Sequence, residues 1–214
     1  MSKIHKSAAY HHGDLRQALI NAACKQLHLV NADALSMRAL ARDVGVSPAA
    51  PFRHFESKTA LFAAVATYGF DLLTVDLQQA ADQYPADIEK SIIETAMAYI
   101  HWAQLNPEKY QLFFDSSLVD FSLHKDLREA GQRAFAILIG LIQCGVEQGV
   151  FVDRPVLEMA GAIWAGIHGT TSLLLTRSAA RDITQEYDLA AKVMDNLAND
   201  PRPNLEMYLA GLKK

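Results

Sequence analysis

Residues 36–58 carry side chains that can donate hydrogen bonds to phosphate groups. Cationic and polar groups gather there, at Arg38, Ser47, Arg53, His54 and Lys58. Donors of this kind position a protein on the DNA backbone, whereas contacts to base edges give sequence specificity. Ala49 and Ala50 lie among them, and such small side chains favour apolar contact with thymine methyl groups. The pattern predicts a DNA-contact surface, and a solvated charged face is the alternative interpretation.

The same residues are expected to form two short helices joined by a tight turn, followed by the start of a third helix. Ser36 is a good cap for the first helix, in which apolar residues recur at helical spacing. Gly45 lies where that helix would end, because it readily adopts a left-handed backbone conformation. Ser47 is expected to cap the second helix, with Pro48 at the first helical position, where its missing N–H costs nothing.

Two helices this short need another helix to bury their apolar faces against. Residues 14–30 supply one, with the stripe Leu15, Leu19, Ala22, Ala23, Leu27 and Val30. This is the layout of a helix-turn-helix unit, whose second helix enters the major groove of DNA. The predicted DNA-binding residues are Arg38, Ser47, Pro48, Ala49, Ala50, Pro51, Phe52, Arg53, His54 and Lys58.

Several motifs resemble those of the TetR family of bacterial transcriptional regulators. In the N-terminal part they are the run LSMRALARDVGVS, the segment Phe52–Phe55, and Lys58 followed by Ala60–Leu61. The opening YHHGDLRQALINAA and the later WAGIHG resemble one branch of that family, which carries a Trp-x3-His-Gly signature in its C-terminal domain. The family usually has Tyr at the position of Phe52, and the tyrosine hydroxyl commonly contacts a DNA phosphate. The implied role of Phe52 is therefore limited to packing.

The resemblance implies an all-α protein with two parts. Residues 1–60 would form the three-helix helix-turn-helix DNA-binding domain, and residues 61–214 would form a helical effector-binding and dimerisation domain. Charge follows the same division. Residues 1–60 carry eight Lys or Arg and four acidic residues, whereas the whole chain has a formal charge of −4. A basic module on an acidic body suits a small DNA contact area.

The ends and the cysteines carry weaker signals. Residues 1–12 form a short polar arm, which is either a disordered terminus or a segment that touches DNA. His11–His12 lack the further ligands of a metal site, so neither a metal nor another cofactor is expected. Cys24 and Cys144 lie in helical patterns and are interpreted as reduced core thiols, with a redox role as the alternative. No signal peptide or continuous apolar span is visible, which predicts a cytoplasmic protein without a membrane segment.

The rest of the chain is predicted to be helical apart from an irregular connection at 118–123 and an extended link at 150–153. The expected helices are 58–83, 86–105, 107–114, 125–148, 155–176, 187–198 and a short last helix from Leu205. The helix at 58–83 would join the DNA-binding unit to the body.

The helix at 155–176 is apolar nearly all round, and such a helix must be buried on more than one side. A second copy of the chain would cover it, so a homodimer is predicted through helices 155–176 and 187–198. Small residues would let the helices approach closely: Ala160, Gly161, Ala162, Ala165, Gly166, Gly169 and Thr170. A two-fold dimer would place two recognition helices about one turn of DNA apart and would read an inverted repeat.

The body is rich in aromatic and methionine side chains, Phe70 and Met159 included, which suggests a cavity for a small, largely apolar effector. The predicted ligand-binding residues are Tyr68, Tyr99, Trp102, Tyr110, Phe113, Phe114, Phe135, Trp164 and His168. His101 and Asp115 are further possible polar anchors. The alternative is that the aromatic residues form ordinary core and that His168 is a hydrogen-bonded core histidine or a dimer contact.

These patterns favour a ligand-responsive, dimeric DNA-binding regulator, expected to act as a repressor that a small molecule releases from its operator. An enzyme is disfavoured because no Ser-His-Asp arrangement, paired-carboxylate motif or phosphate loop is present. The remaining alternative is a helical interaction or ligand-binding protein that keeps the helix-turn-helix as a scaffold. Such a protein would have no operator and no salt-dependent DNA binding.

Overall fold

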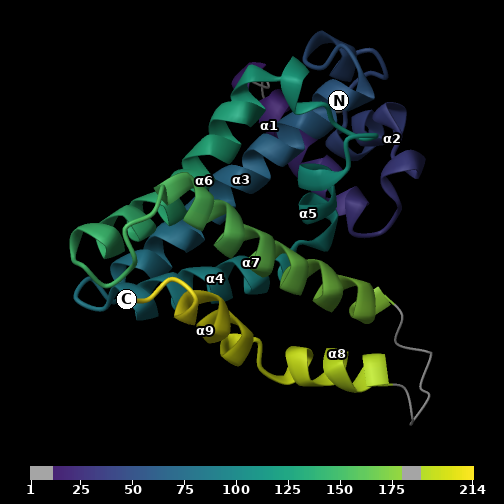
Figure 1. Cartoon of the computed structure of the whole chain (residues 1–214). Coiled ribbons are helices and arrows are strands. Elements are labelled where there is room, and N and C mark those ends of the chain that lie inside the picture. Colours follow the sequence, from purple (N-terminus) through teal and green to yellow (C-terminus); the bar gives the residue numbers. More distant parts are fainter. Residues whose placement is uncertain (1–11, 180–188) are drawn as a thin grey trace, which may run out of the picture.

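The computed structural model describes residues 12–179 and 189–214 (Figure 1). The regular structure of these residues is helical, apart from one isolated bridge between Phe151 and Lys213, and turns and irregular segments join the helices. The α-helices are α1 (His12–Leu27), α2 (Met37–Val44), α3 (Lys58–Asp82), α4 (Ile88–Leu105), α5 (Pro107–Phe114), α6 (Lys125–Glu147), α7 (Val156–Ala179), α8 (Leu189–Asn199) and α9 (Arg202–Ala210). Short 3-10 helices are η1 (Ala32–Ala34), η2 (Pro51–Arg53) and η3 (Phe121–Leu123). The all-α prediction is confirmed. Of the polar arm predicted at 1–12, residues 1–11 lie outside the described residues, whereas His12 begins α1. Residues 187–188 of the predicted helix 187–198 also lie outside them.

The capping residues act as predicted at two helix starts and one helix end. Ser36 Oγ accepts a hydrogen bond from the Ala39 amide at 3.4 Å, and Ser57 Oγ accepts one from the Ala60 amide at 3.0 Å. Gly45 closes α2 with φ of 76°, in the left-handed region. The first helix ends three residues earlier than predicted, because the amides of Leu29 and Val30 both bond back to the Gln26 carbonyl.

The prediction of an α-helix for the second half of the motif is wrong. Residues 48–50 form a turn, and only η2 follows it. The hydrogen bonds there span three residues, from the Ala50 amide to the Ser47 carbonyl at 2.9 Å and from the Arg53 amide to the Ala50 carbonyl at 3.1 Å. Pro51 explains this geometry, because it lacks the amide that would bond Ser47 and its ring would clash with that carbonyl in an α-helix.

Helix α3 is the centre of the fold and contacts α1, α4, α5 and α6. In Figure 1, α1 and α2 gather at one end of the molecule, while α4 and α6 pack against the other part of α3 and α7 packs against α4 and α6. Helices α8 and α9 contact α7 and lie along one side of it. One cluster of buried apolar residues lies around α1, α3 and α5, and a second joins α4, α6, α7 and α9.

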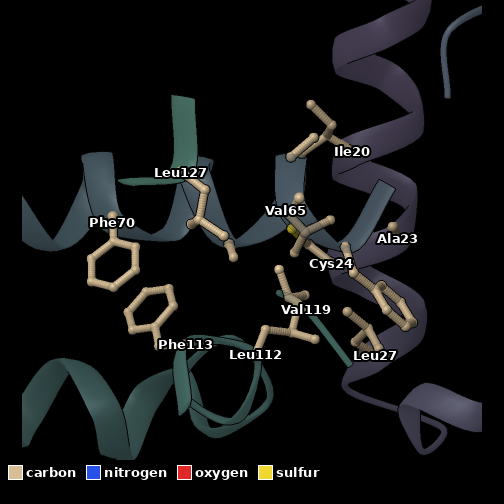
Figure 2. Close-up of a cluster of buried hydrophobic side chains, with 14 of the residues drawn as sticks. Ile20, Ala23, Cys24, Leu27, Val65, Phe70, Leu112, Phe113, Val119 and Leu127 are labelled. Carbon is tan, nitrogen blue, oxygen red and sulfur yellow. The ribbon is translucent and has the colours of Figure 1, made fainter. Parts of the chain in front are cut away.

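The first cluster crosses the predicted domain boundary at residue 60. Figure 2 shows Leu112 of α5 and Val119 beside Cys24 and Leu27 of α1, within one packed group. Burial raises the pKa of the Cys24 thiol, which keeps it protonated, as expected of a core cysteine. The two parts therefore share core packing, and a shift of α5 would be felt by α1 directly.

Helix α3 is long and apolar enough to cross a membrane by length and composition, and it is the one such helix in the described residues. The sequence suggested no such segment because Asp71 and Asp76 interrupt the apolar run. Twelve of its residues are buried against the surrounding helices, which is the position of a core helix.

Candidate nucleic-acid surface and cavity

The predicted DNA-binding residues lie together at the end of the molecule formed by α2, η2 and the start of α3. Exposed members of the set are Arg38, Ser47, Pro48, Ala49, Phe52 and Arg53, and half-buried members are Ala50, His54 and Lys58. Pro51 is buried within the chain, and its contact with DNA stays a prediction. The side chain of Phe52 is 51% exposed, so half of its surface is free of packing within the chain.

The charge of Lys58 is partly engaged within the protein. Its Nζ donates a hydrogen bond to the Asp33 carbonyl at 2.7 Å and lies 5.4 Å from the centre of the Phe62 ring. This bond ties the start of α3 to η1 and holds the ammonium group near the predicted surface. A DNA contact by Lys58 stays a prediction, and it coexists with a bracing role inside the unit.

A cavity of about 760 Å³ lies in the body among α3, α4, α6 and their neighbours, within the size range of small-molecule sites. Five of the nine predicted ligand-binding residues line it: Tyr99, Phe113, Phe114, Phe135 and Trp164. The other lining residues are Phe70, Leu73, Leu77, Ile92, Thr95, Ala96, Phe121, Arg128, Gly131, Gln132, Ala134, Leu138, Ile139 and Ile167. The walls are thus almost entirely apolar.

Four predicted ligand-binding residues lie outside this lining. Trp102 is buried and stacks on Phe113, with ring centres 5.3 Å apart. Tyr68 packs against the first apolar cluster as a partly buried residue. Tyr110 and His168 are bound to each other, with Tyr110 Oη and His168 Nδ1 2.7 Å apart. For Trp102, Tyr110 and His168 the core interpretation fits better, because neighbouring rings and the hydrogen bond already occupy their faces. For Tyr68 it fits because the side chain packs against the cluster.

The residues that the sequence did not single out share a simple pattern. On α6 they recur with Phe135 along one face, at 128, 131, 132, 134, 138 and 139, and on α3 Leu73 and Leu77 follow Phe70, which the sequence had indicated. A stripe of this kind is the normal sign of a buried helix face. Periodicity alone could not show that the space opposite the stripe is empty.

An aromatic group around His168 forms one wall beside the cavity. The imidazole lies 5.2 Å from the Trp164 ring and 4.3 Å from the Phe114 ring, measured between ring centres. Burial lowers the pKa of His168 below its ordinary value, so the neutral ring is favoured. A neutral imidazole can accept a hydrogen bond from the Tyr110 hydroxyl at Nδ1.

His168 is expected to make stability depend on pH. Its pKa is lowered in the folded state, so the unfolded chain binds the proton more readily between that lowered value and about 6.5. Stability should therefore fall as pH decreases below about 6.5. Denaturant unfolding at several pH values should show a shallower fall for His168→Asn, which keeps an acceptor near the Nδ1 position. The same pH dependence in both proteins would contradict this assignment.

The outward surface of α7 and α8 is unusually apolar. Leu157, Leu173, Leu189 and Val193 are exposed, the last two to 77% and 67%. A Cβ atom placed on Gly161 or Gly169 would meet no atom within 4 Å, so the space outside these two positions is open in the isolated chain. In the described residues, no group of three or more His, Cys, Asp or Glu could hold a metal ion.

Comparisons with known proteins match both parts of the chain. The family model described as bacterial regulatory proteins, tetR family, matches residues 19–65, and the model described as tetracyclin repressor-like, C-terminal domain, matches residues 92–197. HTH-type transcriptional regulators of Mycobacterium tuberculosis and Mycobacterium bovis are 28% identical over 128 residues. That match covers 58% of this chain and 54% of theirs, about half the length of these relatives.

Solved structures share the fold over nearly the whole chain. A protein of unknown function from Rhodococcus sp. RHA1 superposes with a TM-score of 0.75 at 25% identity, covering 97% of this chain and all of that one. The TetR family transcriptional regulator PfmR from Thermus thermophilus superposes with a TM-score of 0.62 at 18% identity, covering 92% of this chain and 99% of that one.

Proposed function

The chain is a member of the TetR family of bacterial regulatory proteins, and we propose that it is a dimeric transcriptional repressor whose DNA affinity a small molecule controls. One observation carries the proposal. The exposed surface around η2 and the apolar cavity belong to parts that share α3 and a packed cluster of side chains. Residues 1–60 would be the DNA-binding unit and residues 61–214 the effector-binding and dimerisation body.

Helix α5 is the second physical link between the cavity and the DNA-binding unit. Phe113 and Phe114 line the cavity, whereas Leu112 packs in the cluster that contains α1 (Figure 2). At the start of α5, the Glu108 carboxylate lies 3.1 Å from His28 Nδ1, just beyond the end of α1. An effector that displaces Phe113 would move α5 against α1, in addition to any shift of α3.

Such coupling needs an effector that binds one conformation better than the other. In the proposed mechanism the DNA-bound conformation holds its two recognition segments about one turn of DNA apart, and the effector-bound conformation changes that spacing. Arg38, Arg53 and Lys58 would contact phosphates, while Ala49, Ala50 and Phe52 would face the groove. The apolar surface of α7 and α8 supports a homodimer through these two helices.

The alternative is a scaffold protein that keeps this architecture without an operator. The short, two-proline recognition segment and Phe52 in place of Tyr favour it to some degree, since they offer few polar contacts. It remains the second candidate because the exposed Arg38 and Arg53 suit a phosphate surface. A cytoplasmic location is proposed with either function, since the family's regulators act on chromosomal DNA.

A mobility-shift assay over a salt series tests the proposal. The purified protein would be titrated against DNA from the region upstream of its own gene, with unrelated DNA of equal length as control. We expect two chains per site, a protected inverted repeat, and affinity that falls steeply with salt. A folded dimer that binds both DNAs equally weakly at low salt would instead support the scaffold.

Lys58→Ala should weaken binding to all DNA sequences. In the proposed dimer the change removes two phosphate contacts per operator, so the slope of log affinity against log salt should fall by about 1.8, at about 0.9 per contact. Because Lys58 also braces the Asp33 carbonyl, thermal unfolding of the variant must be measured beside DNA binding. Lys25→Ala, which removes an exposed lysine from α1, is the matched control and should leave the slope unchanged. An unaltered slope for Lys58→Ala would remove this residue from the contact surface.

A further inference from the structure

We propose that the effector is an anionic amphiphile: a single carboxylate head held by Arg128, joined to an elongated apolar body that lies along α6. This inference rests on the proposed function of the cavity as the effector site. It names a charge, a shape and an orientation for the ligand, which an apolar cavity by itself would leave open.

The negative charge of the proposed ligand is inferred from the composition of the cavity lining. Arg128 is the one charged residue among the cavity-lining residues, and none of them is acidic. The remaining polar side chains of the lining are neutral. Thr95 already donates its hydroxyl hydrogen bond to the Ser91 carbonyl at 2.7 Å, whereas the buried Tyr99 hydroxyl has no hydrogen-bond partner among the described residues and could serve as a neutral donor. Within the lining, a negative group would therefore meet an opposite charge only at Arg128.

The guanidinium of Arg128 is held in place with part of its donor set unused. Nη1 donates to the carbonyls of Phe121 and Ser122, at 2.9 and 2.6 Å. Within the described residues, no carboxylate lies within ion-pair distance of Arg128. Arg128 and Gln132 are exposed, so this end of the lining meets solvent and the Nε and Nη2 edge is accessible to a ligand. An edge of this kind can bind a carboxylate through two parallel hydrogen bonds. Gln132, one turn further along α6, supplies a second polar group.

The orientation follows from a change of polarity along α6. Arg128 and Gln132 lie at one end of the lining face, and Phe135, Leu138 and Ile139 continue it. On the opposite wall, Asp71 of α3 pairs with Arg133 of α6, and Leu77 lines the cavity six residues further along α3. Ile92, Leu138 and Ile167 belong to one buried cluster, which places the apolar end of the cavity there. A head at Arg128 thus points the body toward Leu77 and Ile139.

The length of the ligand follows from helix geometry. From Arg128 to Ile139 the α6 axis advances about 16 Å, at roughly 1.5 Å per residue. An extended chain advances about 1.2 Å per bond, judged from the span of an extended backbone, so about 13 bonds would span this length of the cavity. A saturated carboxylate with twelve carbons is therefore a suitable probe.

Binding of dodecanoate and of dodecan-1-ol, each below its aggregation concentration, tests the inference. The change in fluorescence of Trp164, which lines the cavity, reports occupancy. We expect wild-type protein to bind dodecanoate about tenfold or more tightly than the neutral alcohol, an effect typical of one charge-assisted pair. Arg128→Gln should lose that preference, while its affinity for dodecan-1-ol stays unchanged and so shows that the cavity is intact.

Arg133→Gln is the matched control, because Arg133 lies on the same helix but pairs with Asp71 at 2.7 Å instead of lining the cavity. It should keep the wild-type preference for dodecanoate. Equal binding of dodecanoate and dodecan-1-ol, an undiminished preference in Arg128→Gln, or no binding of either probe would each overturn the inference. Operator binding measured on the same preparations separates these outcomes from a failure of the proposed function, because a protein that binds its operator but neither probe overturns only the ligand class.

Discussion

Replacing Ala165 by arginine is expected to split the protein into monomers and to remove high-affinity binding to a two-half-site operator. Ala165 is exposed on the outward surface of α7, between Gly161 and Gly169, where the isolated chain leaves open space. In the proposed dimer this space holds the partner's helix. An arginine there would be too large for the close approach and would be buried without a partner charge, which costs several kcal/mol at an interface.

The Ala165→Arg change should reduce DNA affinity much more than it reduces the stability of the fold. Two linked half-site contacts gain about a hundredfold to ten-thousandfold over one, and a monomer loses that gain. The inner side of α7, with Met159 and Ile163 in the second cluster, is untouched, so the monomer should stay helical. Sedimentation measures the oligomeric state, circular dichroism the helix content, and the mobility shift the DNA affinity. Val75→Arg, an exposed apolar site on α3, is the control and should stay dimeric. A dimeric Ala165→Arg protein would place the interface elsewhere.

The dimer prediction shows what a sequence can tell about an unpaired surface. The segment around α7 is apolar on every side, and one chain of this size can cover only part of such a helix. The structure buries the side with Met159, Ile163 and Ile167 and leaves Leu157 and Leu173 exposed. The pattern thus pointed to an apolar surface that the protomer does not cover, and the partner itself stays a proposal.

Helix boundaries were predictable where a local rule acts on one or two residues. Ser36, Gly45 and Ser57 fix the ends of α2 and α3 through their own side chain or backbone conformation. The recognition segment was mispredicted because two local rules compete there. Pro48 suits the first turn of a helix, but Pro51 follows three residues later and prevents an α-helix from forming. The second proline decides the outcome, and it leaves a turn followed by η2.

The cavity was only partly predictable, because packing and lining use the same residue types. Tyr99 and Trp102 lie three residues apart on α4, yet one faces the cavity and the other stacks on Phe113. Tyr110 lies outside the lining, where its hydroxyl is hydrogen-bonded to His168, a residue 58 positions later in the chain. Arg128, the charged lining residue, was missed because a lone arginine on an amphipathic helix usually belongs to the solvent side. Its place in the lining became apparent only from the structure, in which its guanidinium bonds to the carbonyls of Phe121 and Ser122 in η3.

Gly145→Ala is expected to destabilise the protein, although the same change at Gly140, in the same helix, should stabilise it. A Cβ atom at Gly145 would overlap the ring of Phe151, which is fully buried and held by its bridge to Lys213. The amides of Val150 and Phe151 both bond to the Gly145 carbonyl, at 2.9 and 3.2 Å, so the ring cannot retreat easily. Overpacking of this kind costs about 1–3 kcal/mol and should outweigh the higher helix propensity of alanine.

At Gly140 only the propensity acts, because a Cβ atom there would meet nothing within 4 Å. Gly140→Ala should therefore add about 0.5–1 kcal/mol to the free energy of unfolding. Thermal unfolding at one fixed protein concentration compares the two variants, with a shift of roughly 2–4 °C for each kcal/mol in a chain of this size. Adding Phe151→Leu to Gly145→Ala should recover part of the loss, since the two side chains are in contact. Equal shifts at both glycines would mean that the end of α6 adapts to the added methyl group, and that Phe151 does not fix its position.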